Sequence, residues 1–383
     1  MSQVLDLFSN IGNFTWQQGL MIFIGALLIY LAIKKDMEPA LLLPMGFGAI
    51  LVNLPLSGAV GPDGIITTLF RAGIENELFP LLLFIGIGAM IDFAPLLSNP
   101  KMLLFGAAAQ FGIFFTFSMA SLLGFVPKDA ASIAIIGAAD GPTSIFVAGL
   151  FKSNYFGPIM VAAYSYMALV PIIQPPVIRL VTTRKERLIR MAYVQKPISQ
   201  ATKILFPIVV TIIAGVIAPA SVSLVGFLMF GNLIRECGVL RGLSESAQKE
   251  LANLITLLLG ISIGFRMQAL ETTFNGITVP GFVSVETLVI MLLGLIAFIF
   301  DTVGGVFFAK IMNLFSKNKV NPMIGAAGIS AFPMSSRVVH KMGLKEDPEN
   351  FLLMHAAGAN VSGQIASVIA GGLIISMIGP LVK

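Results

Sequence analysis

Apolar runs long enough to cross a lipid bilayer recur along the whole chain. An α-helix rises about 1.5 Å per residue, so roughly 20 apolar residues span the hydrocarbon core of a bilayer. With 56% of its residues hydrophobic and 11% charged, the chain predicts an all-α, polytopic membrane protein with about ten transmembrane helices. We expect these helices at 19–33, 38–55, 77–94, 102–124, 157–178, 204–219, 221–235, 251–265, 286–309 and 351–379.

Two further apolar segments, 131–152 and 322–342, are interrupted by glycine, proline, serine and threonine. We expect both to be re-entrant or broken helices, because irregular backbone at membrane depth persists only where protein or water satisfies it. In the first segment, Asp140 is followed by Gly141 and Pro142, which end a helix by freeing dihedral angles and removing a hydrogen-bond donor. A carboxylate at this depth usually faces a cavity and marks an ion or proton path.

Short motifs recur in the same order in two parts of the chain. Ile136-Gly-Ala-Ala recurs as Ile324-Gly-Ala-Ala, and Met160-Val-Ala-Ala is echoed by Met354-His-Ala-Ala. The expected topology starts the two copies on opposite sides of the membrane, and inverted repeats with paired broken helices place a substrate site near the midplane. The predicted organisation is an N-terminal transmembrane scaffold at 1–75, a first repeat at 76–180, a basic loop with central helices at 181–250, and a second repeat at 251–383.

Charged and rare residues exclude several classes of protein. The densest basic run, Arg179 to Lys203, lies in a loop, and the positive-inside rule assigns it to the cytoplasm. The net charge of +5 therefore needs no nucleic-acid partner, and both chain termini are expected outside. One cysteine, Cys237, excludes a disulfide framework, and two histidines are too few for a histidine-based transition-metal centre. No convincing signal-peptide pattern is present.

Oxygen-bearing side chains gather on the broken segments and on the spans that follow them. Hard cations such as Na⁺ prefer oxygen ligands, so these residues predict a Na⁺ site around one central carboxylate. Hydroxyl groups at such positions also satisfy helix carbonyls or allow close helix packing, and that alternative stays open for each serine and threonine. The candidate ligands are Asp140, Thr143, Ser144, Asn360 and Ser362.

Three further residues have two interpretations each. Asp301 is a second carboxylate within a span, and it is either the coupling group or a partner of a basic residue. Arg337 ends the second broken segment, where its planar guanidinium could bind a carboxylate or could simply reach the membrane interface. Tyr166 is most simply a packing residue, but its hydroxyl could also donate a proton or bind an ion.

Three long motifs carry a resemblance to a known family. In this order and over nearly the whole chain, they resemble the β subunit of the Na⁺-pumping biotin-dependent decarboxylases that act on oxaloacetate, methylmalonyl-CoA or glutaconyl-CoA. The resemblance implies that the chain takes carboxybiotin from a partner, decarboxylates it with proton uptake, and exports Na⁺. The motifs are Gly137-Ala-Ala-Asp140-Gly-Pro-Thr143, Gly231-Asn-Leu-Ile-Arg235-Glu-Cys-Gly-Val239 and Asn321-Pro-Met-Ile-Gly325-Ala-Ala-Gly-Ile-Ser330-Ala-Phe-Pro333-Met-Ser-Ser-Arg337.

The resemblance also implies roles for individual residues and partners. It assigns Na⁺ binding to Asp140 and Asn360, catalysis to Arg337, Tyr166 and Ser330, and carboxybiotin contacts to Arg337, Asn321 and Gly325. The implied cofactors are Na⁺ and carboxybiotin, and the biotin is expected on a partner because no lysine here lies in an Ala-Met-Lys-Met context. The implied partners are a biotin carrier subunit, a carboxyltransferase subunit, a small membrane subunit, the lipid bilayer and further copies of the chain in a trimer.

The expected location is a bacterial or archaeal inner membrane. The chief alternative is a stand-alone secondary transporter, either a Na⁺/H⁺ antiporter or an organic-acid symporter, because inverted repeats with broken helices are typical of that class.

Overall fold

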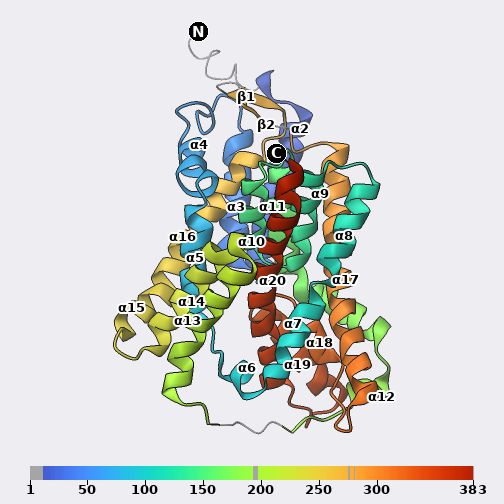
Figure 1. Ribbon diagram of the computed structural model, residues 1–383. Helices are drawn as coiled ribbons and strands as arrows, with labels where there is room; N and C mark the ends of the chain where they lie inside the picture. Colours follow the sequence, from blue (N-terminus) through green and yellow to red (C-terminus); the bar gives the residue numbers. More distant parts are fainter. Residues whose placement is uncertain (1–11, 193–196, 275–276, 280, 383) are drawn as a thin grey trace.

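The computed structural model of the protein describes residues 12–192, 197–274, 277–279 and 281–382, and most of this part of the chain is helical (Figure 1). A short antiparallel pair, β1 (Thr272–Phe274) and β2 (Ile277–Val279), was not expected from the sequence. The α-helices are α2 (Trp16–Lys35), α3 (Pro39–Asn53), α4 (Ile65–Phe70), α5 (Leu78–Met90), α6 (Ala94–Ser98), α7 (Leu103–Ala109), α8 (Phe111–Leu122), α9 (Pro127–Ala134), α10 (Gly141–Leu150), α11 (Phe156–Val181), α12 (Arg184–Arg187), α13 (Gln200–Ile217), α14 (Val222–Glu236), α15 (Arg241–Ser246), α16 (Ala252–Ile263), α17 (Val285–Phe315), α18 (Met323–Ala326), α19 (Met334–Glu346) and α20 (Leu353–Val382).

The helices that could cross a membrane are long and apolar. In the described part of the chain six helices meet that requirement, or up to seven if the bent pair Ile65–Glu75 and Leu78–Met90 forms one span. All-α membrane architecture is therefore confirmed, while the number of about ten transmembrane helices stays a prediction. The difference arises because α3 and α14 have 15 residues each and α16 has 12, which is short for a complete crossing.

Polar residues set the starts of several long helices. Thr15, Ser199 and Ser284 each precede a helix, and each side chain accepts a hydrogen bond from the backbone N–H three residues later. These caps satisfy amides that have no partner within the helix. The apolar runs after them then continue as α2, α13 and α17.

Close helix contacts depend on glycine. A Cβ atom at Gly88 of α5 would lie 1.8 Å from the Leu228 carbonyl oxygen of α14, and one at Gly231 of α14 would lie 2.0 Å from the Ile85 oxygen. Such small residues let backbones approach where lipid offers no hydrophobic driving force. The last helix of each predicted repeat also packs against the other repeat, α11 on α17 and α20 on α7. These two matching contacts are what an internal repeat would produce, and the repeat itself stays a prediction.

The first broken segment is a re-entrant hairpin, and we call residues 127–154 the first hairpin. Helix α9 passes through a 3₁₀ turn, Ile135–Ala138, and breaks where Ala139 adopts a left-handed φ of 52°. Helix α10 then runs back, because the buried Asp129 carboxylate accepts hydrogen bonds from Ser153 Oγ at 2.7 Å and from the Asn154 backbone and side-chain nitrogens at 3.0 Å. The two ends of this hairpin therefore lie together on one side.

The second broken segment, residues 321–350, is the second hairpin. It consists of α18, an irregular stretch and α19. Its ends are joined through another part of the chain, because Asn321 Nδ2 and Asn350 Nδ2 donate to the same Arg187 carbonyl oxygen, at 2.9 and 3.0 Å. Asn321 Nδ2 also donates to the Ile189 oxygen at 2.9 Å. We call residues 182–192, which bridge this base, the strap.

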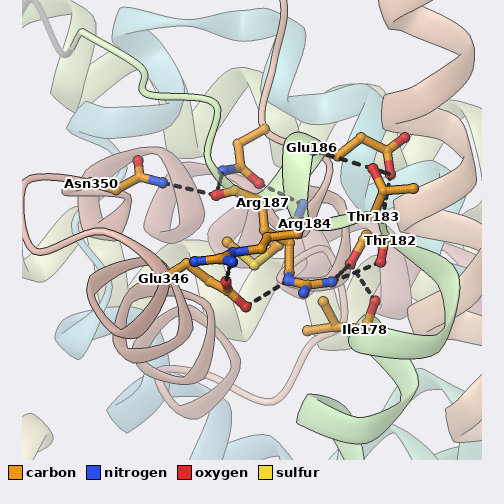
Figure 2. A network of polar contacts seen from close by, with 10 residues as sticks. Ile178, Thr182, Thr183, Arg184, Glu186, Arg187, Glu346 and Asn350 are labelled. Carbon is orange, nitrogen blue, oxygen red and sulfur yellow. Dashed lines mark hydrogen bonds and ion pairs between the residues drawn. The ribbon is translucent and has the colours of Figure 1, made fainter.

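Ion pairs hold the strap against the second hairpin (Figure 2). Arg187 Nε lies 2.7 Å from Glu346, and Arg190 lies 2.5 Å from both Asp347 and Glu349. The strap belongs to the basic run that was expected in the cytoplasm. We call the end of the molecule that carries α12 and the loop 316–320 the basic end. It lies opposite β1 and β2 (Figure 1).

Candidate functional site

Asp140 lies at the break of the first hairpin and is buried, with 3% of its surface exposed. It is the residue immediately before α10, where the unpaired N–H groups and helix dipole favour a negative charge. Thr143 Oγ1 donates to Asp140 Oδ2 at 2.6 Å. Ser144 Oγ donates to the Asp140 carbonyl oxygen at 2.9 Å, so it braces the break rather than the carboxylate.

Helix α20 joins the tips of the two hairpins through one polar stripe. Asn360, Gln364 and Ser367 are spaced i, i+4 and i+7, which places them on one face of a helix. Ser367 Oγ lies 3.4 Å from Asp140 Oδ2 and 2.9 Å from Ser330 Oγ, so a single hydroxyl contacts both tips.

The other two residues of the stripe bind the second hairpin. Gln364 Nε2 donates to the Ser330 hydroxyl at 3.1 Å and to its carbonyl oxygen. Asn360 Nδ2 donates to the Ile329 carbonyl oxygen at 2.7 Å. The polar site therefore lies where both broken segments and α20 converge, far from either end of α20.

Several buried oxygens at this convergence have no hydrogen-bond donor within the described part of the protein. They are Asn360 Oδ1, Gln364 Oε1 and the Tyr164 hydroxyl. Buried polar atoms normally have a partner, and unpaired ones need an explanation such as a bound ion. Together with the Asp140 carboxylate they offer hard oxygen ligands and one negative charge, a donor set that suits Na⁺.

Tyr164 was missed in the sequence analysis, which selected Tyr166. The Tyr164 ring packs on Gly141, where a Cβ atom would lie 2.2 Å from its Cε1, and this contact explains the glycine after Asp140. Tyr166 lies elsewhere on α11, and its hydroxyl donates to the Met291 carbonyl oxygen of α17. The structure thus places Tyr164, not Tyr166, against the break.

Ser362 is not brought to Asp140. Its hydroxyl donates to the Met102 and Ala359 oxygens at 2.8 Å each and accepts from the Gly106 N–H at 3.0 Å. It follows Asn360 by two residues, which is a rotation of about 200° around the helix, so it faces α7. Ser367 occupies the position that sequence analysis gave to Ser362, and the i, i+4, i+7 spacing was the signal that could have found it.

The predicted residues of the second hairpin have different surroundings. Gly325 lies against α17, where a Cβ atom would be 1.9 Å from the Gly305 oxygen, so its backbone contact leaves no room for a side chain. The fully buried Asn321 holds the strap and also accepts from the Met323 N–H at 3.1 Å.

Arg337 is exposed in the first turn of α19, and its charge acts on Glu38 in the turn between α2 and α3. Burial raises the pKa of the Glu38 carboxyl, and Arg337 opposes that rise.

Asp301 is fully buried on α17 and lies beside the start of α8. A Cβ atom at Gly112 would be 2.4 Å from Asp301 Oδ1, and one at Gly137 would be 2.8 Å from Oδ2. Among the ion pairs of the described residues, none includes Asp301. Its environment is the N-terminal turn of α8 and the first hairpin, rather than a basic side chain.

Comparison with known proteins gives a consistent result over nearly the full length. The family model for the Na⁺-transporting oxaloacetate decarboxylase beta subunit matches residues 17–378. The chain is 47% identical to the glutaconyl-CoA decarboxylase subunit beta of Acidaminococcus fermentans, over 96% of this chain and 94% of that one. It is 48% identical to the methylmalonyl-CoA decarboxylase subunit beta of Veillonella parvula, over 95% and 94%. It is 40% identical to the oxaloacetate decarboxylase beta chain of Klebsiella pneumoniae, over 94% and 95%.

Proposed function

Because the chain belongs to the family of the Na⁺-transporting oxaloacetate decarboxylase β subunit, we propose that the oxygen cluster around Asp140 binds Na⁺ during transport. The chain is a multi-pass membrane subunit of a Na⁺-transporting, biotin-dependent decarboxylase. A stand-alone secondary transporter is not favoured by these relatives.

One observation carries the proposal for the ion site: Ser367 contacts both Asp140 and Ser330, and so links the two broken segments at one point. Asp140 supplies the charge, and Thr143, Ser367 and the unpaired oxygens of α20 supply neutral ligands. Ion sites of this kind, built from broken helices near the midplane, let two hairpins on opposite sides alternate in opening. The proposed ligands are therefore Asp140, Thr143, Asn360, Gln364 and Ser367, with Ser144 as a brace.

We assign the basic end to the cytoplasm by the positive-inside rule. Carboxybiotin, carried by a biotin carrier subunit, then reaches the second hairpin from that side. In the proposed step the bond between the ureido nitrogen and the carboxyl carbon breaks, CO₂ leaves, and the nitrogen takes up one proton. Arg337 is proposed to hold the carboxylate, because its exposed guanidinium matches the geometry of that group. Transfer of the carboxylate to a drier site would favour loss of CO₂.

The other partners follow from family membership and are proposals. A carboxyltransferase subunit would load the carrier, a small membrane subunit would complete the complex, and further copies of the chain would form a trimer. The proposed location is the inner membrane of a prokaryotic cell. Tyr166, Ser330 and Gly325 are proposed to act by positioning, because their contacts are with neighbouring backbone or with the α20 stripe.

The first test measures CO₂ release from carboxylated carrier by membranes that contain the chain and its partner subunits, with and without Na⁺. Asp140→Asn should abolish the Na⁺-dependent part, and the exposed Asp63→Asn should behave like wild type. Equal Na⁺ stimulation in Asp140→Asn would reject the ion site. Na⁺ flux driven by a pH gradient, without any CO₂ release, would reject the decarboxylase.

The second test concerns the proposed carboxylate-binding residue. Arg337→Ala should abolish decarboxylation in a folded protein, and Arg337→Lys should restore only part of it, because a lysine keeps the charge but not the planar fork. Retained turnover in Arg337→Ala would reject the role.

A further inference from the structure

A pocket of about 1020 Å³ opens at the basic end beside the strap, and Arg337 is not among the described residues that line it. Its walls are the turn before α7, the end of the strap, the loop after α17 and the start of α20. Lys101, Lys317 and Lys319 line it together with Arg190, and the described residues of its lining include no aspartate or glutamate. The pocket therefore has the charge pattern of a site for an anion.

Two helix starts add to this positive character. The 3₁₀ turn Pro100–Met102 leads directly into α7, and α20 starts at Leu353, next to the lining residues Met354 and His355. Helix N-termini carry partial positive charge and unpaired N–H groups, which favour anions. Arg190 is already paired with two carboxylates. Lys101 and Lys317 are exposed and take part in no ion pair among the described residues.

Two apolar grooves lie next to this pocket on the surface of α7 and α8, since Leu103 follows the pocket residue Met102 and Ile311 precedes the pocket residue Met312. Figure 1 shows α7 between α17 and α20. A groove of about 570 Å³ lies on the α17 side, and one of about 290 Å³ lies on the α20 side. Both are lined by Ala107, Gln110 and Phe114, and the exposed Leu103 and Ile311 mark their open edges.

The pocket and the grooves share helix faces. On α17, Met312 lines the pocket, and Phe308, one turn away, lines the first groove. On α20, His355 lines the pocket and Ser362 lines the second groove. Residues seven apart differ by only about 20° around a helix, so these two lie on one face. That face looks toward α7, whereas the Asp140 stripe is on another face. The pocket and the grooves therefore lie one after the other along the same helix faces, and the proposed ion site lies on a different face of α20.

We propose that this composite surface binds one anionic phospholipid. The phosphate lies in the basic pocket near Lys101 and Lys317, and the two acyl chains lie in the grooves on either side of α7 and α8. Basic pockets between helices on the cytoplasmic side suit anionic headgroups, and apolar grooves suit acyl chains. A soluble anion such as inorganic phosphate would use only the pocket and would leave the exposed apolar grooves uncovered.

The test uses native mass spectrometry of the intact protein released from nanodiscs of phosphatidylglycerol or phosphatidylcholine. The wild type should retain one phosphatidylglycerol, and millimolar inorganic phosphate should not displace it. The double variant Lys101→Gln/Lys317→Gln should lower phosphatidylglycerol affinity about thirtyfold, because each basic residue near the membrane surface contributes about 1 kcal/mol, or about fivefold, and the two factors multiply.

Two further variants separate the lipid from other occupants. Lys185→Gln/Lys249→Gln changes two exposed lysines outside the pocket and should leave lipid binding unchanged. Ala366→Phe fills the α20-side groove and should weaken lipid binding while all the lysines remain.

Three results would overturn the proposal: equal retention of both lipids, displacement of the lipid by inorganic phosphate, and normal lipid retention in Lys101→Gln/Lys317→Gln. If that variant kept its lipid but lost carrier-dependent CO₂ release, the pocket would be a docking surface for the carrier. The mass of the retained lipid is measured without any CO₂ release or Na⁺ transport. A negative result for the lipid would therefore leave the proposed decarboxylation and ion site untouched, and the reverse also holds.

Discussion

Asn321 offers a sharp test of how the second hairpin is held. The resemblance implied a contact with carboxybiotin, but the structure uses most of the hydrogen-bonding capacity of its amide inside the protein. Both side-chain N–H groups donate to strap carbonyls, at 2.9 Å each, and the side-chain oxygen accepts from the Met323 N–H at 3.1 Å. One acceptor lone pair remains. We therefore predict that Asn321→Ala frees the strap.

The expected magnitude follows from the two bonds to the strap, because the Met323 bond lies within the second hairpin. Each buried hydrogen bond contributes about 1 kcal/mol net, so Asn321→Ala should destabilise the closed strap by about 2 kcal/mol. That free energy corresponds to opening of the strap about 30 times more often. Asn321→Asp keeps the oxygen that accepts from the Met323 N–H, but it loses both N–H donors. Its negatively charged carboxylate would also lie against the two strap carbonyl oxygens. Its effect should be at least as large.

The assay is amide hydrogen exchange of the strap, combined with CO₂ release at several concentrations of carboxylated carrier. Asn321→Ala should lose strap protection and lower kcat, while Asn318→Ala, an exposed neighbour in the same loop, should do neither. Unchanged exchange with a raised KM for the carrier would refute this reasoning and assign Asn321 to the substrate.

Three shorter predictions concern other parts of the fold. Ser367→Ala removes the hydroxyl between the tips and should raise the Na⁺ concentration for half-maximal CO₂ release about tenfold, and an unchanged value would exclude it from the site. Asp129→Ala leaves three donors without their acceptor and should destabilise the first hairpin by about 3 kcal/mol, seen as faster hydrogen exchange there, with a smaller loss in Asp129→Asn. The hydrogen bond from Arg190 holds the pKa of Asp347 below its ordinary 3.8, so this pair stabilises the strap above that pH and is lost as pH falls through the depressed pKa. Strap exchange, corrected for its intrinsic pH dependence, should therefore stay constant from pH 8 to pH 5, and loosening near pH 6 would contradict the assignment.

Local chemistry was enough to predict much of this fold. Long apolar runs with few charges can form only helices in a bilayer, and Gly141-Pro142 after Asp140 had to interrupt one. The same reasoning located the second break and the basic run that contains the strap. The short β1 and β2 pair was missed because three-residue strands carry almost no periodic signal.

Contacts between distant segments were the part that local chemistry could not supply. The bond from Asn321 to the Arg187 carbonyl joins residues 134 positions apart, and nothing near either residue indicates the other. Tyr164 and Tyr166 are two residues apart on α11, so only the packing of the first hairpin could select between them. The choice of Ser362 over Ser367 was different, because the helical period from Asn360 already favoured Ser367.

The two hairpins differ in what closes their bases, and the difference bears on how such proteins can be recombined. Asp129 closes the first hairpin with residues from the same contiguous stretch. Residues 127–154 could therefore be grafted between relatives as a single segment that contains the hydrogen bonds closing its own base. The second hairpin is closed by the strap, which is encoded far upstream. A chimera that exchanges residues 321–350 alone would combine a second hairpin and a strap from different proteins. A working graft would therefore need residues 182–192 from the same donor.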